Sequence, residues 1–272
     1  MGKWKKLLIG EWSWWRPLQS LACIYLCLLV VALFFSNKLI HHPPEPGYKS
    51  DDPGLHQITR ANGEKVILYF RAAAPGMPTL LWSHGNAEDI GYLHERLIEF
   101  NNRGYGILAY DYPGYGHSEG KPTEKGCYEA AAAAYDYLTT TLKVPETQVI
   151  IYGQSVGSGS ATWLATQRPC AGLVLVAPFT TAFRSITRVP LFPGDQFKNI
   201  KHIGEIDVPL LVIHGDHDEV ISQWHGKKLH ELHAGPKTFL GIQGVGHNDI
   251  YLLAMEEVIT ALDNFYAGLR VY

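Results

Sequence analysis

Apolar residues are arranged along the chain in two ways. Residues 18–35 form an almost unbroken apolar run, whereas from residue 66 onward short apolar runs alternate with longer mixed stretches. The short runs predict strands and the longer stretches predict helices. Strands are expected at 66–70, 79–82, 106–110, 148–152, 172–176, 209–213 and 237–240. Helices are expected at 88–101, 123–142, 157–167, 222–232 and 249–266.

This alternation of strand and helix predicts an α/β fold with a mostly parallel sheet covered by helices on both faces. The first strand follows an Asn62-Gly63 pair and a facing run around Ile58, a pattern typical of a β-hairpin. One segment, 178–207, breaks the alternation. It is expected to form a short cap, and an ordinary long loop over the sheet edge is the alternative. Its larger apolar residues are candidates either for exposure near an acyl pocket or for packing on the sheet, and both alternatives stay open: Phe179, Phe183, Leu191, Phe192 and Phe197.

The N-terminal apolar run predicts a transmembrane anchor at 18–36. At 1.5 Å of rise per residue its core would span roughly 27 Å, enough for a thin hydrocarbon layer. Basic and tryptophan residues precede it, as expected of a cytoplasmic flank and an interfacial belt: Lys3, Lys5, Lys6, Trp12, Trp14, Trp15 and Arg16. The alternatives are a cleaved signal peptide, disfavoured because residues 34–37 offer no small-x-small site, and a buried core helix.

Four segments follow from this pattern. Residues 1–17 form a cytoplasmic basic and aromatic segment, and 18–36 form the anchor. A linker occupies 37–50, where prolines exclude a continued helix. Residues 51–272 are expected to form one exported globular domain, periplasmic if the source is bacterial.

Composition narrows the function. Hydrophobic residues make up 46% and charged residues 18%, so the chain can bury a sizeable core. The net charge of -3 and the lack of a basic block beyond the N-terminus argue against nucleic acid as a partner. Cys127 and Cys170 are too far apart in sequence for their pairing to be decided. The sequence does not indicate an oligomeric state.

The sequence Gly-Gln-Ser-Val-Gly at 153–157 carries the main chemical signal. It matches G-x-S-x-G and lies between a predicted strand and a predicted helix, which is the context of a nucleophile elbow. Ser155 is therefore the expected nucleophile.

A serine nucleophile needs a base and a group that orients the base. His247 lies in a loop after the last predicted strand and just before the last helix. Hydrolases with a nucleophile elbow carry their catalytic histidine at this place in the chain. The acid is expected in the loop after 209–213, which offers Asp216, Asp218 and Glu219.

The oxyanion hole requires two backbone N–H donors. One is expected from Val156 and the other from the loop after 79–82, with Asn86 preferred and Ala87 second. His84 is expected to hold that turn, and Asp111 is expected to be structural. No metal site and no cofactor are implied, since no ligand or nucleotide spacing is present.

Four motifs together resemble the Bem-like branch of the α/β-hydrolase domain proteins, which includes subfamilies 13 and 17. The motifs are Trp-Ser-His-Gly-Asn-Ala at 82–87, Tyr-Asp-Tyr-Pro-Gly-Tyr-Gly at 110–116, Tyr-Gly-Gln-Ser-Val-Gly at 152–157 and Gly-His-Asn-Asp-Ile at 246–250. The resemblance implies the α/β-hydrolase fold and assigns the acid to Asp218. Subfamily 17 removes palmitate from cysteine thioesters. That subfamily attaches through an N-terminal cysteine cluster, whereas this chain has a hydrophobic anchor.

The sequence thus predicts a membrane-anchored serine hydrolase of carboxylic esters or acyl thioesters. The catalytic residues are Ser155, His247 and Asp218, and the substrate is an acyl ester or thioester, from a lipid or an acylated protein. Two alternatives remain open: a serine peptidase or amidase, which would use the same triad, and a non-catalytic binding module held at the membrane.

Overall fold

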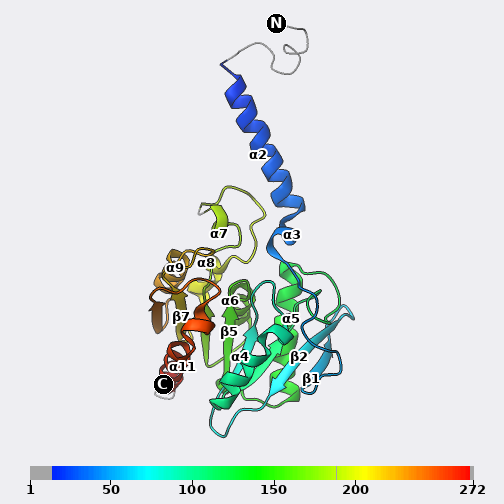
Figure 1. Ribbon diagram of the computed structural model, residues 1–272, viewed down its shortest axis with the longest axis vertical. Helices are drawn as coiled ribbons and strands as arrows, with labels where there is room; N and C mark the ends of the chain where they lie inside the picture. Colours follow the sequence, from blue (N-terminus) through cyan, green and yellow to red (C-terminus); the bar gives the residue numbers. More distant parts are fainter. Residues whose placement is uncertain (1–13, 188, 270–272) are drawn as a thin grey trace.

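The computed structural model describes residues 14–187 and 189–269. A long helix, α2 (Arg16–Phe34), projects from a globular domain, as Figure 1 shows. The predicted flanking residues Lys3, Lys5, Lys6 and Trp12 lie outside the described residues.

The domain is built on an eight-stranded sheet in the order β1-β2-β4-β3-β5-β6-β7-β8. β1 and β2 form the predicted hairpin, and β2 also pairs antiparallel with β4. The other pairs are parallel. The strands are β1 (Leu55–Thr59), β2 (Lys65–Arg71), β3 (Thr79–Ser83), β4 (Gly106–Tyr110), β5 (Val149–Gln154), β6 (Gly172–Val176), β7 (Leu210–Gly215) and β8 (Lys237–Ile242).

Helices cover both faces of the sheet, which confirms the predicted α/β-hydrolase fold. Side chains of α5 (Glu124–Asp136), α6 (Gly157–Gln167) and α9 (Trp224–Leu232) pack on one face. Side chains of α4 (Ile90–Asn102), α10 (Ile250–Leu253) and α11 (Met255–Leu269) pack on the other. The central strands are buried on both faces because they are covered in this way, and this explains their continuous apolar runs.

Several predicted boundaries differ from the observed ones. Of the helix expected at 123–142, α5 (Glu124–Asp136) is α-helical. The chain then continues as a π-helical turn, Tyr137–Thr141. The helix expected at 249–266 is divided into α10 and α11. The segment 178–207 contains two short helices, α7 (Arg184–Thr187) and α8 (Asn199–His202), and a 3₁₀ turn, Ile203–Glu205. A second 3₁₀ turn, Glu146–Gln148, precedes β5.

Two of the apolar residues in 178–207 for which exposure and packing were both open are buried. Phe179 is 4% and Phe197 is 1% exposed. Both belong to the core cluster around α5 and α6, where the Phe197 ring meets the rings of Tyr128 and His41 edge-on. Apolar side chains at the base of the segment therefore fix it to the domain.

The N-terminal helix α2 is long and apolar enough to cross a membrane, judged by length and composition. Most of its side chains are exposed, with Ala32 the buried exception. A short helix, α3 (Ser36–Ile40), follows directly. The segment predicted as a linker begins in α3 and packs on the domain: His41 is 4% exposed, and the Gly47 N–H donates to the Asp89 carboxylate at 2.8 Å.

The cysteines of the domain are not bridged. Cys127 is buried and Cys170 is half-buried, and both are free thiols. Burial raises the pKa of the Cys170 thiol to about 12, so it is protonated at neutral pH.

Candidate active site

Ser155 lies on a sharp turn between β5 and α6. Its φ of 50° is in the left-handed region, which is strained for a residue with a side chain. The flanking glycines make the turn possible. A Cβ at Gly153 would lie 2.5 Å from the Ala161 side chain, and one at Gly157 would lie 2.1 Å from the Ser83 carbonyl oxygen. The strand-turn-helix expected around Ser155 is thus present in the structure.

The structure brings Ser155, His247 and Asp218 together from three loops at the carboxyl edge of the parallel strands. His247 Nε2 lies 3.0 Å from Ser155 Oγ. On the other side of the ring, His247 Nδ1 lies 2.7 Å from Asp218 Oδ2. Both are hydrogen-bond distances. This arrangement allows the imidazole to take a proton from the serine while the carboxylate holds its tautomer.

Asp218 is held as a carboxylate by several donors. Oδ1 accepts from the backbone N–H groups of Val220 at 3.0 Å and Ile221 at 2.6 Å. His214 Nε2 lies 3.1 Å from Oδ2, beside the contact with His247. Burial opposes the charge, yet the hydrogen bonds from His214 and His247 hold the pKa of Asp218 well below its usual range. The group is therefore ionised at neutral pH.

Asp216, the other aspartate considered as the acid, lies outside this arrangement. It is exposed, and its Oδ1 lies 2.7 Å from His217 Nδ1 and accepts from the Gly244 N–H at 2.7 Å. These hydrogen bonds lower its pKa. Asp216 thus ties its own loop to the loop that carries His247.

Backbone donors next to Ser155 are available for an oxyanion. Within the described residues, neither the Val156 N–H nor the Asn86 N–H donates to a protein atom. Ala87, the second candidate, has its N–H directed to the Asn86 Oδ1 at 3.0 Å. The Asn86 N–H is consequently freer than that of Ala87. Both Asn86 and Val156 line the same groove as Ser155.

The Asn86 side chain is fixed by the segment that follows the apolar helix. Its Nδ2 donates to the Ile40 carbonyl at 2.7 Å, and its Oδ1 accepts from the His42 N–H at 2.9 Å and the Tyr115 hydroxyl at 2.7 Å. The loop that offers the Asn86 N–H is thereby held in place from the N-terminal side of the chain.

The groove at Ser155 has a volume of about 430 Å³. Its walls come from the cap segment, through Phe183 and Ile186, and from α3, through Leu39 and Ile40. The sequence predicts residues 36–40 as the end of an anchor and the start of a linker, with no part in the site. Nothing in their sequence marks this contact, because it depends on how the chain returns to the domain.

His214 was also missed as a site residue. The His-Gly pair at 214–215 offered a signal, since it ends the strand before the Asp218 loop. The ring is completely buried, and its Nε2 lies between the Ile221 carbonyl at 2.8 Å and Asp218.

His84 and Asp111 lie next to each other beneath the oxyanion loop. His84 is completely buried, its Nδ1 lies 2.7 Å from the Gly85 carbonyl oxygen, and burial lowers its pKa to about 4. Asp111 accepts from the Ile90 N–H and from the Tyr48 hydroxyl. Burial raises the pKa of Asp111 to about 7. Neither side chain contacts Ser155 among the described residues.

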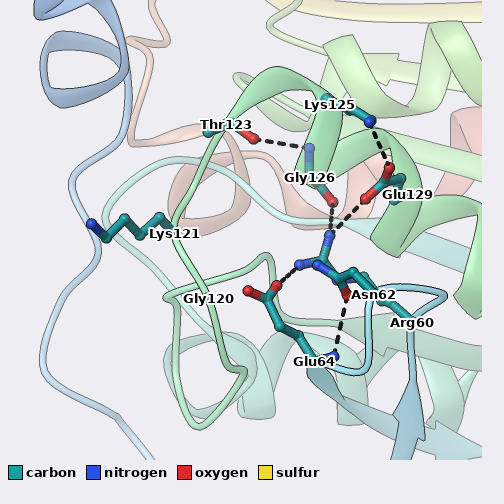
Figure 2. Close-up of a pocket in the computed structure, with 9 residues that line it drawn as sticks. All are labelled: Arg60, Asn62, Glu64, Gly120, Lys121, Thr123, Lys125, Gly126 and Glu129. Carbon is teal, nitrogen blue, oxygen red and sulfur yellow. Dashed lines mark hydrogen bonds and ion pairs between the residues drawn. The ribbon is translucent and has the colours of Figure 1, made fainter.

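A second recess, shown in Figure 2, is lined in part by charged residues that pair with one another, namely Arg60, Glu64, Lys125 and Glu129. Arg60, at the end of β1, makes ion pairs with Glu64 of the hairpin turn and with Glu129 of α5. Its Nη1 also donates to the Gly126 carbonyl, and Lys125 lies 3.6 Å from Glu129. These contacts join the β1–β2 hairpin to α5, so we assign the recess a structural role.

Fold and site together define a hydrolase of the α/β-hydrolase class. Residues 77–192 match the family model of serine aminopeptidase, S33. The chain is 36% identical over 266 residues to human α/β-hydrolase domain-containing protein 17B, covering 86% of this chain and 91% of the relative. It is 38% identical over 192 residues to mouse protein 17C, covering 69% of this chain and 59% of the relative.

The chain therefore belongs to the family of α/β-hydrolase domain-containing proteins related to 17B and 17C, as the sequence motifs predicted. Among solved structures it is similar to an esterase of Pyrococcus furiosus, with a TM-score of 0.69 and 18% identity. That likeness covers 84% of this chain and 98% of the esterase, and it supports the fold.

Proposed function

We propose that this protein is a membrane-anchored serine hydrolase that cleaves carboxylic esters or acyl thioesters. The observation that carries the proposal is the chain of contacts from Ser155 Oγ through His247 to Asp218, with distances of 3.0 and 2.7 Å. An activated nucleophile requires such a chain. Val156 and Asn86 supply the two oxyanion donors in the proposal.

In the proposed reaction, Ser155 Oγ attacks the acyl carbonyl carbon and its proton passes to His247 Nε2. The carbonyl oxygen becomes an oxyanion that accepts from the N–H groups of Val156 and Asn86. The bond to the leaving alcohol or thiol breaks, and His247 returns the proton to that group. Water then attacks the acyl-enzyme by the same route, which releases the acid and restores Ser155.

The proposed anchor is α2, with the catalytic domain on the exported side. The exposed apolar surface of the helix and its length support a membrane location. The tryptophans Trp14 and Trp15 at its start are 81% and 69% exposed, as expected of an interfacial belt. An anchor that ends directly before the groove keeps the site close to lipid, so an amphiphilic acyl substrate, including a palmitoyl thioester, is the proposed class.

The groove supports an acyl chain because Leu39, Ile40, Phe183 and Ile186 give it apolar walls. Each buried methylene contributes roughly 0.8 kcal/mol, so four additional carbons would contribute about 3 kcal/mol. We therefore expect kcat/KM to rise from acetyl to octanoyl esters in the wild-type chain. A steady fall from acetyl onward, measured below the aggregation limit of each ester, would exclude the acyl groove.

The serine mechanism is tested with a fluorophosphonate probe, which reacts with an activated serine. We expect the full chain to be labelled and the Ser155→Ala variant not to be. Absence of labelling in a folded wild-type chain would favour the non-catalytic binding module. Matched p-nitrophenyl esters, acyl thioesters and p-nitroanilides then separate ester and thioester hydrolysis from amide hydrolysis, the activity suggested by the aminopeptidase name of the family model.

A further inference from the structure

Residues 183–193 form a segment, here called the apolar loop, that carries three exposed apolar side chains. Ile186 is 83% exposed, and Val189 and Leu191 are each 51% exposed. The sequence of the loop contains two arginines and no acidic residue. Clustered exposed apolar side chains on a soluble domain mark a surface that meets a partner or a membrane.

The apolar loop lies against the lower half of α2, as Figure 1 shows in the yellow-green segment beside the blue helix. The ring of Phe192 stacks on that of Tyr25, with centroids 5.5 Å apart. At the loop's end, a Cβ built at Gly194 would lie 3.3 Å from the Leu33 side chain. Leu33 and Tyr25 are separated by about 12 Å along a helix, so the contact extends well into the apolar stretch.

The contact with α2 also satisfies a backbone group of the apolar loop. The Tyr25 hydroxyl donates to the Leu191 carbonyl at 3.2 Å. In water such a carbonyl would be solvated, but next to hydrocarbon an unpaired carbonyl costs several kcal/mol. A hydroxyl within the apolar helix at this position therefore suits a loop that lies among lipids.

Both ends of the apolar loop are fixed. The Asp195 carboxylate accepts from the Phe183 N–H at 2.8 Å and closes the base of the loop. Gln196 Nε2 donates to Ser36 Oγ at 2.9 Å and to Asn37 Oδ1 at 3.0 Å, at the junction of α2 and α3. The loop is thus held beside α2 at two positions. The polar contacts lie at the α2–α3 junction, and the stack of Phe192 on Tyr25 lies further toward the N-terminus of α2.

The apolar loop also forms part of the groove at Ser155. Phe183 and Ile186 line one side of the groove, and Leu39 and Ile40 of α3 line another. The same two elements, the loop and the α2–α3 segment, therefore enclose the groove and approach the apolar helix.

We propose that the apolar loop is a second membrane contact, inserted among the acyl chains of the leaflet that surrounds the domain end of α2. The acyl chain of the substrate then enters the Ser155 groove from this leaflet, between the loop and α3. This inference rests on the proposed anchor and nucleophile. The occupant of the surface is the lipid leaflet, because the loop is continuous with the face of α2 that a bilayer would cover.

Insertion is tested with an environment-sensitive fluorophore at position 191. The full chain carries Cys23→Ser, Cys27→Ser and Leu191→Cys, and it is placed in phosphatidylcholine vesicles that contain doxyl-labelled lipids. The same chain without Leu191→Cys gives the background from the two remaining thiols. The matched control is Leu232→Cys, because Leu232 is 38% exposed and ends α9, the helix that runs back from the carboxyl edge of β7.

We expect the label at 191 to be quenched at least about threefold more than the label at 232, as for a side chain among the acyl chains of the leaflet. Equal and weak quenching at both positions would overturn the proposal, and it would point to a protein partner for the loop. This measurement does not require activity, so it remains decisive even if the proposed hydrolase function fails.

Delivery of substrate is tested with the double variant Val189→Ser/Leu191→Ser and with Leu232→Ser as its control. Neither Val189 nor Leu191 lines the groove. We expect hydrolysis of vesicle-embedded p-nitrophenyl palmitate to fall by about tenfold in the double variant, because two apolar anchors are lost. Hydrolysis of soluble p-nitrophenyl butyrate should stay within about twofold, as for a surface change.

The outcomes separate the two proposals. Delivery of substrate from the leaflet would be overturned if the double variant hydrolysed the palmitate ester as fast as the wild-type chain. It would also be overturned if the double variant lost the same fraction of activity toward both esters. If the wild-type chain hydrolysed neither ester and Ser155 were not labelled by a fluorophosphonate, the proposed function would fail instead.

Discussion

Replacing Asp218 with asparagine tests the central contact of the proposed site. An asparagine of the same shape can keep one acceptor toward the backbone N–H groups of Val220 and Ile221. It then presents Nδ2, a donor, to His247 Nδ1, which lies 2.7 Å from the replaced oxygen. Two donors cannot pair, so the imidazole must carry its proton on Nε2 and can no longer accept the Ser155 proton.

The expected cost follows from losing the base. Wrong-tautomer variants of other triads lose about 10⁴-fold in turnover, which corresponds to about 5.5 kcal/mol of transition-state stabilisation. His214 Nε2, 3.1 Å from the same oxygen, meets the same conflict. We therefore expect Asp218→Asn to lower kcat for p-nitrophenyl butyrate by about 10³ to 10⁴-fold.

Asp216→Asn is the matched control because it makes the same chemical change two residues away. Asp216 is exposed and contacts His217 and the Gly244 N–H, not His247. We expect its kcat to stay within about threefold of wild type, as for a surface position. The assay is steady-state hydrolysis by the full chain in detergent, with melting temperatures measured in parallel to show that both variants fold.

Two results would refute this reasoning. If Asp216→Asn lost as much activity as expected for Asp218→Asn, the acid would be misassigned. If folded Asp218→Asn kept its turnover within tenfold of wild type, orientation of His247 would not depend on a carboxylate.

Three further predictions concern the nucleophile, the elbow and the segment after α2. Ser155→Ala should lower hydrolysis by at least about 10³-fold while the melting temperature stays near that of wild type. Gly157→Ala should destabilise the fold by about 3 kcal/mol in urea titrations, because its Cβ would lie 2.1 Å from the Ser83 carbonyl; unchanged stability would contradict the close approach. Burial, aided by His42, lowers the pKa of His41 to about 4, so stability is fully present above the unfolded value of 6.5 and lost as the pH falls toward 4. His41→Gln should reduce the loss of stability between pH 6.5 and pH 4 by about 3 kcal/mol, and an unchanged loss would count against it.

Much of the domain could be predicted because its signals are local. The apolar run of each central strand and the turn residues at 62–63 are visible in the sequence, and both depend on short-range geometry. The elbow around Ser155 is similarly local, since its glycines are required by approaches of 2.5 Å or less to neighbouring atoms. Sequence reasoning alone left Asp216, Asp218 and Glu219 as candidate acids, and the resemblance to a family selected Asp218.

The parts that could not be predicted depend on tertiary contacts. The segment around Phe179 and Phe197 has no clear period, so its sequence leaves both exposure and packing open, and in the structure both side chains pack into the core near α6. The contact of His214 with Asp218 requires the strand end and the following loop to fold back on each other. Helix α3 lies between the apolar helix α2 and a stretch with several prolines. No pattern in its sequence indicates that it lines the groove.

The proposed anchor and the proposed active site share a structural element, which has a mechanistic consequence. The Ile40 carbonyl and the His42 N–H hold the side chain of Asn86, and the backbone N–H of Asn86 is the proposed oxyanion donor. A shift of the chain at residues 40–42 would therefore move that donor. Since a single oxyanion donor is typically worth about 10² to 10³ in turnover, the proposal implies that the segment after α2 influences the chemical step as well as the distance to the membrane. A flexible tether would leave kcat independent of its sequence, whereas here the path of the chain from α2 to the domain forms part of the site.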